Sequence, residues 1–459
     1  MTTRHRALLS VALVACACAD AAGQTSLAAR IDAIVETPIT AGKVAGASVA
    51  VVKGGQTLLL KGYGLADIEL DVPTPPGATY EIGSVTKQFT AASILLLQEQ
   101  GKLSLDDEIT KYLPDYPTQG HRITLRRLLN HTSGIKSYTE MKEFGEFQRL
   151  KRPRQELVTL FSAQPFDFAP GEEQIYNNSA FFLLGLVVEK VSGLSYEAFV
   201  QQHLFDRVGM KSSYYCSERT IHKNHAHGYD TDESTLVLKA YLDHSWPYAA
   251  GSLCSNAVDL VAWNTALHGG KVLTAASYKE MTSPGVLNDG TPIRYGMGIG
   301  LADIGGRHAV AHGGGINGFL SESEYYPDED LVIVVLLNTA GPVGPRDIAT
   351  QIAAAVLGPA PSKARPFTGD LSAYAGVFTG RGRGRASTVT IAATGGTLTF
   401  TAAPGGTPEV LTYLGGMTFG FKDTLVMFEK QEGKVARLRL DTGAGHNILA
   451  RQAGPGRVH

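Results

Sequence analysis

The sequence predicts an α+β fold with an inserted helical region, followed by a small all-β domain that is a barrel or a sandwich. Three observations predict it. Strand-like segments occur early, at 45–64, and again late, at 321–340, so distant parts of the chain must share one sheet. Between them, 105–285 has mainly helical apolar periodicity. Beyond a Pro-rich linker, short alternating segments indicate β-structure.

The early strands form a predicted hairpin. AGASVAVVKGGQTLLLKGYG reads as two strands joined at Lys53-Gly54-Gly55, a turn that suits glycine. A helix is predicted from Ser84 to Gln100, because its apolar residues cover most of the helix circumference, and Gly101 is placed to end it. After the late strands, RDIATQIAAAVLG predicts a closing helix.

The linker and the last domain differ in composition from the rest. GPAPSKARPF places a linker at 358–366, and 367–459 carries runs such as STVTIAA, TLTFTA and VARLRLD separated by glycine turns. The GRGRGR run at 380–385 resembles an RNA-binding segment by composition. Since it lies between two strands of a near-neutral protein, we interpret it as a solvated hairpin loop.

The first residues resemble a secretory leader. Within 1–22, Arg4 and Arg6 precede an apolar run and then small residues, which is the layout of a signal peptide. The run is too short for a membrane anchor of the folded protein, and no other segment approaches about 20 apolar residues. The sequence predicts an exported protein that is periplasmic, secreted or lipid-anchored. Cleavage near Ala21 and lipidation of Cys16 both remain open.

Composition limits the partners. The net charge of the 459 residues is -2, which gives no electrostatic attraction for nucleic acid or an anionic membrane. We expect a small-molecule or short-peptide substrate, no nucleic acid, and membrane contact only through a lipid on Cys16. The sequence does not predict the oligomeric state.

A serine and a lysine stand one turn apart at the start of the predicted buried helix. On a helix, Ser84 and Lys87 share a face, and a lysine in a desolvated site can lose enough basicity to take a proton from serine. By itself S-x-x-K is a weak signal. Ser133 and Lys136 repeat it, but the glycine at 134 indicates a loop that would not hold the pair face to face.

Two further polar elements accompany this pair. Tyr176 and Asn178 directly precede an apolar helix: a phenol beside a lysine can relay protons, and an amide can orient the lysine or a substrate carbonyl. The plain alternative is a helix cap with a surface tyrosine. His312 begins a run that contains Gly314 and Gly315, where backbone can approach a ligand closely and supply an oxyanion donor; the alternative is a glycine-rich strand turn.

Taken in order, S-x-x-K, Y-x-N and a late H-x-G resemble the penicillin-recognising serine hydrolases: class C β-lactamases, D-alanyl-D-alanine carboxypeptidases, D-aminopeptidases and related esterases. LLNHTSG, AAGSLCSNAVDLVAW and the ASVAVVKGGQ hairpin are similar too. The resemblance covers 27–357, and the region after it is similar to small β-barrel domains appended to some members. It implies a β-lactamase/transpeptidase-like fold, in which an antiparallel sheet is flanked by helices and joined by an all-helical subdomain, with the site in the cleft between them.

The resemblance also implies roles for the matching residues. Ser84 would be the nucleophile, Lys87 its base, and Tyr176 a proton carrier in deacylation. Asn178 would position substrate, Gly315 would complete the oxyanion hole with Ser84, and His312 would bind substrate or assist proton transfer. No cofactor or metal is implied, and the expected activity is an esterase, D-peptidase or β-lactamase.

One departure bears on the substrate. The β-lactamase form of the third motif is K-T-G, whose cation and hydroxyl suit a substrate carboxylate, whereas this chain has H-G-G. Histidine is mostly neutral near pH 7, so capture of a carboxylate by this motif should weaken. This departure favours a broad esterase or a D-peptidase.

Other interpretations remain open. Cys216 and Cys254 are a candidate disulfide, with two free thiols as the alternative. The segment HKNHAHGYDTDE invites a zinc site from His222, His225, His227, Asp230 and Asp232, but its spacing is irregular and a solvated loop is favoured. A protein with a silent cleft that binds cell-wall peptides is the alternative to an enzyme.

Overall fold

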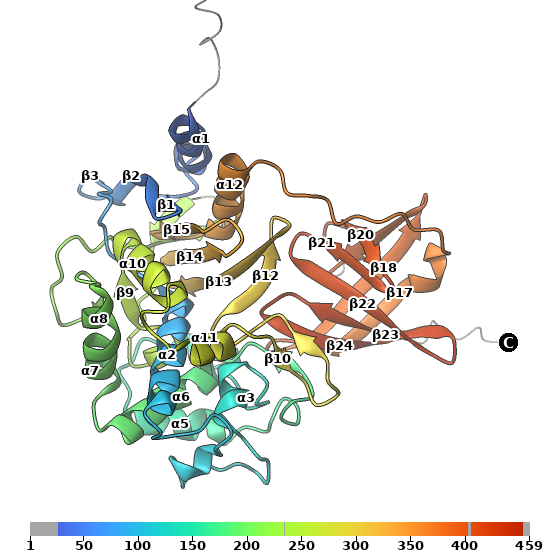
Figure 1. Cartoon of the computed structure of the whole chain (residues 1–459), viewed down its shortest axis with the longest axis horizontal. Helices are drawn as coiled ribbons and strands as arrows, with labels where there is room; N and C mark the ends of the chain where they lie inside the picture. Colours follow the sequence, from blue (N-terminus) through green and yellow to red (C-terminus); the bar gives the residue numbers. More distant parts are fainter. Residues whose placement is uncertain (1–25, 234, 403–404, 453–459) are drawn as a thin grey trace, which may run out of the picture.

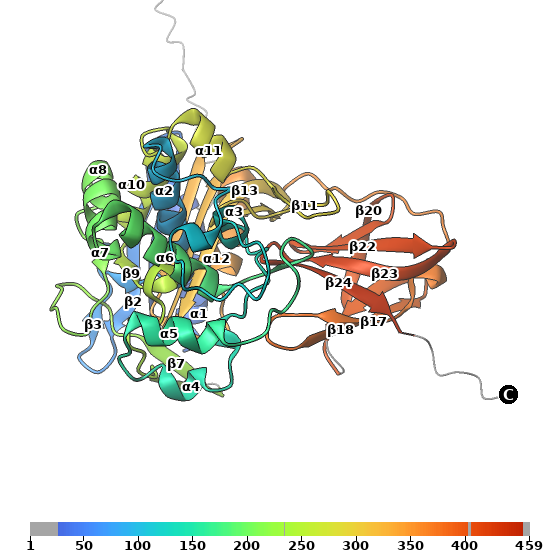
Figure 2. The same cartoon turned by 90° about the horizontal axis from the view of Figure 1, so that it is seen from below.

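The computed structural model describes residues 26–233, 235–402 and 405–452 (Figures 1 and 2). The predicted leader at 1–22, with Cys16, lies outside the described residues, as do the last seven residues of the predicted β domain.

A seven-stranded antiparallel sheet forms the centre of the larger domain. Its order is β12 (Gly300–Ile304), β13 (Arg307–Ile316), β14 (Phe319–Tyr326), β15 (Leu331–Leu337), β1 (Gly46–Lys53), β2 (Gln56–Asp67) and β3 (Val72–Pro73). β1 pairs with β2 on one side and with β15 on the other, in the register Ala47 to Leu337. The prediction that early and late segments share one sheet is therefore confirmed.

Helices cover both faces of this sheet, which explains why β15 reads as an unbroken apolar run. All seven residues of β15 are buried. On one face lie α1 (Leu27–Thr40) and α12 (Pro345–Leu357), and on the other α2 (Thr86–Glu99) and α10 (Ala257–His268) (Figure 1). The two faces have separate hydrophobic cores.

The segment between sheet halves is mainly helical, as predicted. It contains α3 (Leu125–Leu129), α4 (Phe144–Phe147), α5 (Arg154–Ser162), α6 (Asn178–Ser192), α7 (Tyr196–Val200), α8 (Asp206–Val208), α9 (Tyr248–Gly251) and α11 (Ala275–Met281). Short strands β4 (Tyr80–Glu81), β9 (Leu253–Ser255) and β6 (Tyr214–Tyr215) form a small sheet. Further short strands are β5 (Gln174–Ile175), β7 (Tyr229–Asp232), β8 (Thr235–Leu238), β10 (Gly285–Val286), β11 (Pro292–Ile293) and β16 (Thr339–Ala340).

The helix predicted from Ser84 begins later than expected. A 3-10 turn, Gly83–Val85, precedes α2, so Ser84 lies in the turn and Lys87 is the second residue of the helix. The chain ends α2 at Glu99 and turns at Gly101, where φ is +68°, a conformation that favours glycine. This end of the helix was predicted correctly.

The C-terminal domain is all-β, as predicted, and of the two predicted forms it is a barrel, closed by eight strands. Its strands are β17 (Gly376–Arg381), β18 (Ala386–Thr394), β19 (Thr397–Thr401), β20 (Glu409–Gly415), β21 (Thr418–Phe421), β22 (Thr424–Gln431), β23 (Lys434–Asp441) and β24 (Gly445–Arg451). β17 pairs with both β18 and β24, which closes the barrel. Phe367 already packs on the barrel aromatics Tyr413 and Phe419.

The barrel docks against the larger domain beside β12 (Figures 1 and 2). β24 pairs with β5 (Gln174–Ile175), the short strand that leads to Tyr176. Ion pairs add to this contact: Arg294 with Asp441 at 3.0 Å and Arg439 with Asp289 at 2.6 Å. The barrel is thereby fixed to the segment that carries the predicted tyrosine.

Each helix that the structure describes differs from a membrane-spanning helix in length or apolar content. Among the described residues, no single helix is long and apolar enough to cross a bilayer. The two helices at 178–192 and 196–208 are long and apolar enough when taken together, but a 77° bend separates them. Much of α6 lies in the hydrophobic core.

Candidate active site

Ser84 is the one residue of the segment 78–97 that is not fully buried. The 3-10 turn holds it at the surface of a cavity while the chain on both sides enters the core. Gly83 makes this possible: its φ is +49°, and a Cβ there would lie 2.9 Å from the Gly315 nitrogen. The serine is therefore presented on a tight turn beside strand β13.

Lys87 is completely buried and makes three polar contacts. Its Nζ lies 3.2 Å from Ser84 Oγ, 2.7 Å from Asn178 Oδ1 and 2.8 Å from the Ala250 carbonyl oxygen. Ala250 belongs to α9, within the AAGSLC stretch singled out in the sequence. A buried lysine without a carboxylate partner is costly when charged.

The surroundings of Lys87 favour its neutral form. Burial lowers the pKa of Lys87 well below its ordinary value, and the positive charge of Arg383 lowers it further. A neutral amine has two N–H groups and one lone pair. Because the Asn178 and Ala250 oxygens can only accept, they take the two N–H groups, and the lone pair is left for Ser84, the partner that can donate. This arrangement makes Lys87 a base for the serine hydroxyl.

Asn178 orients the lysine, which is the first of the two roles predicted for it. Asn178 is the first residue of α6, and the helix cap is its neighbour Asn177, whose side chain accepts from Ala180 N. The cap interpretation of Asn178 is therefore wrong by one residue. The Asn178 amide is fixed because its Nδ2 donates to Thr139 Oγ1 at 3.1 Å, which leaves Oδ1 facing the lysine.

Tyr176 lies over the same group of atoms. Lys87 Nζ is 4.8 Å from its ring centroid, and the ring packs on His131 at 4.4 Å. Burial raises the pKa of Tyr176 above its ordinary value, and the nearby Ser84 hydroxyl and Arg383 oppose the rise. Its hydroxyl is buried and makes no hydrogen bond among the described residues. Tyr176 is thus a neutral phenol available to a ligand, and Lys87 is the better base.

The glycines of β13 form the wall opposite the serine. A Cβ on Gly314 would lie 2.0 Å from the Ile82 carbonyl oxygen, whereas one on Gly315 would meet only Leu320 at 3.4 Å. Gly314 therefore permits the close approach of the turn to the strand. Gly315 lines both cavities that contain Ser84.

His312 lies in the same cavity wall, but both of its ring nitrogens are engaged. Nδ1 lies 2.6 Å from the Gly313 carbonyl oxygen, which can only accept, so Nδ1 carries the proton. Nε2 then accepts from Tyr295 Oη at 2.9 Å. Burial lowers the pKa of His312 to about 3, so it is neutral. In this structure the histidine positions Tyr295 and the glycine strand and has no free nitrogen for a substrate.

Two cavities meet at Ser84. One has a volume of about 360 Å³ and is lined by Tyr176, His312 and the glycines, and the other, of about 170 Å³, lies towards Pro247 and Ile316. A larger cavity of about 700 Å³ lies between Arg122 and Lys279, away from these groups. We place the site at Ser84, because a nucleophile, a base and a phenol converge there.

The alternative motifs do not converge. Lys136 pairs with Asp167 at 2.9 Å and not with Ser133, as the loop interpretation predicted. Of the proposed zinc ligands, His222 stacks on Tyr214, and His225 Nδ1 lies 3.0 Å from the Tyr214 hydroxyl.

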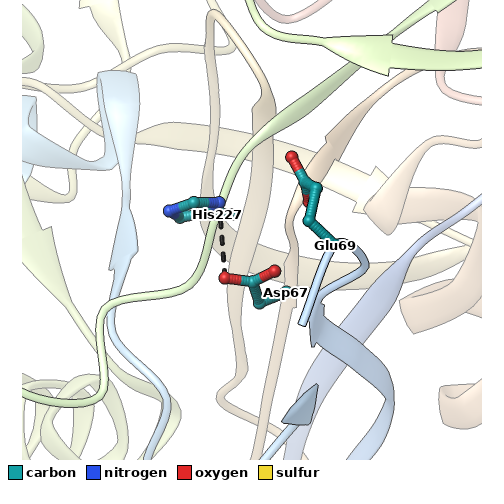
Figure 3. Close-up of side chains that lie close together, drawn as sticks. All are labelled: Asp67, Glu69 and His227. Carbon is teal, nitrogen blue, oxygen red and sulfur yellow. Dashed lines mark ion pairs between the residues drawn. The ribbon is translucent and has the colours of Figure 1, made fainter. Parts of the chain in front are cut away.

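His227 has different neighbours. It lies 3.5 Å from Asp67, with Glu69 nearby (Figure 3). These three residues could hold a metal by their spacing, but Glu69 and His227 are exposed, and none of the three lines either cavity at Ser84.

The structure joins Cys216 and Cys254 in a disulfide. Cys254 lies in β9, which pairs with β4 just before the serine turn and follows the helix that supplies Ala250. The bond therefore cross-links the segment that follows the Ala250 helix and lies beside the serine turn.

Four residues of the site were missed by sequence reasoning. His131 accepts from Asn177 N at 3.2 Å beneath Tyr176, and Tyr295 holds His312. Arg346 and Arg383 line the cavity of about 360 Å³ at Ser84. The LLNHTSG stretch could have indicated His131, but no local pattern marks the others. The loop predicted as solvated, 380–385, is a hairpin, yet its Arg383 reaches the cleft.

Comparison with known proteins gives the family. The model of the Beta-lactamase family matches residues 31–357. The chain is 31% identical over 319 residues to Protein flp of Staphylococcus aureus (strain MW2), covering 67% of this chain and 62% of that protein. The chain thus spans less than two thirds of that relative's length.

Two solved structures are also similar. A D-stereospecific amidohydrolase from Streptomyces sp. is 28% identical, with a TM-score of 0.62, over 73% of this chain and 100% of that one. The octameric penicillin-binding protein homologue from Pyrococcus abyssi is 24% identical, with a TM-score of 0.64, over 91% of this chain and 99% of that one, which shows a shared fold. The chain belongs to the beta-lactamase family of serine hydrolases.

Proposed function

We propose that the protein hydrolyses an ester or amide through an acyl-enzyme formed on Ser84. The observation that carries this proposal is the contact set of Lys87: its Nζ donates to the Asn178 and Ala250 oxygens and lies 3.2 Å from Ser84 Oγ. In the neutral amine these two acceptors leave the lone pair for the serine. Membership of a serine hydrolase family supports it.

The proposed steps use residues that meet in the cleft. Lys87 takes the Ser84 proton as the serine oxygen attacks the carbonyl carbon, and the oxyanion is stabilised by the backbone N–H groups of Ser84 and Gly315. Tyr176 gives its proton to the leaving oxygen or nitrogen and regains one from the Lys87 ammonium. Water then attacks the acyl group by the reverse sequence, which releases the acid and restores the serine.

Two features bear on the substrate class. The third motif contributes the neutral His312 where K-T-G would contribute a cation. The similar Streptomyces protein is named a D-stereospecific amidohydrolase. We propose a D-peptidase or broad esterase on this basis.

The test is intact-mass analysis after incubation with a fluorophosphonate, p-nitrophenyl esters, benzylpenicillin and a D-Ala-D-Ala peptide. The proposal expects one adduct per chain on Ser84, absent in Ser84→Ala. Ser133→Ala is the matched control, since Ser133 belongs to the second S-x-x-K and should not affect the adduct. A protein that binds these compounds without any adduct would be a silent binder.

We further propose export. The signal-like composition of 1–22 and the disulfide are typical of proteins in oxidising compartments. The mass of the N-terminal peptide from cell fractions tests this, because a free terminus near Ala21 and a lipidated Cys16 differ in mass. A chain that keeps Met1 and stays with the cytosol would contradict it.

A further inference from the structure

The barrel contributes a cation to the site. Arg383 lies at the tip of the hairpin between β17 and β18, and it lines both cavities at Ser84. Ser84, Asn178 and Gly315 are the other residues common to the two linings. A residue of the C-terminal domain therefore stands where the two cavities join, next to the nucleophile.

Contacts with the larger domain hold the hairpin and Arg383 in this position. Arg383 Nε donates to Glu140 Oε1 at 2.6 Å, and the guanidinium lies 5.2 Å from the Tyr176 ring centroid. Gly384 has φ +68°, and a Cβ there would lie 2.4 Å from Glu140 Oε2. At the base of the hairpin, Arg381 pairs with Glu173 at 2.7 Å. These contacts hold one edge of the guanidinium, while its Nη1 makes no hydrogen bond among the described residues.

The charged side chains that line the cleft are cationic. The described residues that line the two cavities include Arg383 and Arg346 but no aspartate or glutamate. Arg346 is committed to Glu322 at 2.9 Å, and the partner of Arg383, Glu140, lies outside both linings. Since His312 is neutral, Arg383 is the cation nearest the serine that has donors to spare for a ligand.

We propose that Arg383 binds a carboxylate of the substrate, next to the scissile carbonyl, and so makes the barrel a determinant of specificity. A guanidinium binds a carboxylate through paired, charge-assisted hydrogen bonds. Arg383 would supply the carboxylate recognition that the H-G-G motif lacks. The inference rests on the proposed function in that it takes the Ser84 cleft as the substrate site.

Binding measurements on the full chain test this without turnover when every protein compared also carries Ser84→Ala, which prevents hydrolysis of the amide. Isothermal titration calorimetry compares N-acetyl-D-alanine with its amide, which differ only in the carboxylate. The protein that keeps Arg383 should prefer the acid, and Arg383→Gln should weaken binding of the acid at least tenfold and of the amide less than twofold. Arg383→Lys should recover part of the loss. Arg385→Gln is the matched control, because Arg385 is exposed in the same hairpin and lines neither cavity.

Rates give a second readout. For an N-acyl-D-Ala-D-Ala substrate and its C-terminal amide, Arg383→Gln should raise KM for the acid and lower the ratio of kcat/KM, acid over amide, at least tenfold. Because Arg383 also lowers the pKa of Lys87, the variant should shift the acid limb of both rate profiles to higher pH alike, so only the ratio reports carboxylate binding.

Two outcomes would overturn the inference: no preference for the acid when Arg383 is present, or equal losses for acid and amide in Arg383→Gln. Failure of the proposed function is distinguishable, since it appears as the absence of a Ser84 adduct, whereas the calorimetric comparison gives its result with or without acylation.

Discussion

Asn178 Oδ1 lies 2.7 Å from Lys87 Nζ, closer than the 3.2 Å between that nitrogen and Ser84 Oγ. The asparagine and the Ala250 carbonyl together fix the direction of the amine. Since neither carries a negative charge, they stabilise the ammonium less than a carboxylate would, and burial lowers the pKa of Lys87 well below its ordinary value.

Replacing Asn178 with aspartate should oppose the lowering of the Lys87 pKa. A carboxylate beside the lysine favours the ammonium, so the pKa of Lys87 should rise. Activity needs the neutral amine, so it appears as pH rises through the pKa of Lys87, and Asn178→Asp should shift this acid limb to higher pH. The kcat/KM profile of a p-nitrophenyl ester measures the shift. Asn178→Ala is the control, expected to lower the rate without adding charge. An unchanged limb in Asn178→Asp would contradict the role of Lys87.

Tyr176→Phe should lower kcat about a hundredfold, because in the proposed mechanism the neutral phenol donates a proton to the leaving group. The loss should be larger for an amide than for a p-nitrophenyl ester, whose leaving group needs no proton. The thermal unfolding temperature should change little, since the hydroxyl makes no hydrogen bond in the protein. Equal losses for both substrates would argue against proton donation.

Gly314→Ala should lower the free energy of unfolding by about 1–3 kcal/mol, because its Cβ would overlap the Ile82 carbonyl and force the serine turn from β13. Gly315→Ala, on the same strand, is the matched control and should cost much less, since its Cβ meets a flexible leucine at 3.4 Å. Urea titrations compare them. Equal costs would contradict the close approach of Gly314 and Ile82.

Removing the disulfide with Cys216→Ala and Cys254→Ala should destabilise the larger domain. The bond joins residues 38 positions apart, and for such a loop the chain-entropy relation gives about 4 kcal/mol, within a usual range of about 2–4 kcal/mol. Calorimetric scans with and without a reductant check it: reduction should lower the wild-type unfolding temperature and leave the double variant unchanged. A wild type that is insensitive to reduction would contradict this expectation.

The fold was predictable where the pattern was strong. The unbroken apolar run of β15 and the all-round burial of α2 both follow from hydrophobic content, and the barrel follows from short alternating segments. The start of α2 was misplaced because a 3-10 turn and an α-helix have similar local sequences, and the Gly83 turn is set by contact with β13.

The site was predictable only in part. Ser84, Lys87 and Tyr176 stand in recognisable motifs, and the structure brings them together. Arg383 could not be found, because its role depends on how the barrel docks, and that docking depends on pairs such as Arg381 with Glu173, which are far apart in sequence. His312 was expected to bind substrate or assist proton transfer. The sequence did not indicate that Tyr295 would form a hydrogen bond with its Nε2.

The most direct test of the central claim is the titration of Lys87 itself. NMR of protein labelled with 13C at lysine Cε, with the Lys87 signal assigned from its loss in Lys87→Arg, measures the pKa of this amine. The account predicts a pKa far below the ordinary lysine value of about 10.4, so that the amine is neutral where the enzyme works. A Lys87 signal that titrates at or above about 10.4 would contradict the assignment of Lys87 as the base for Ser84.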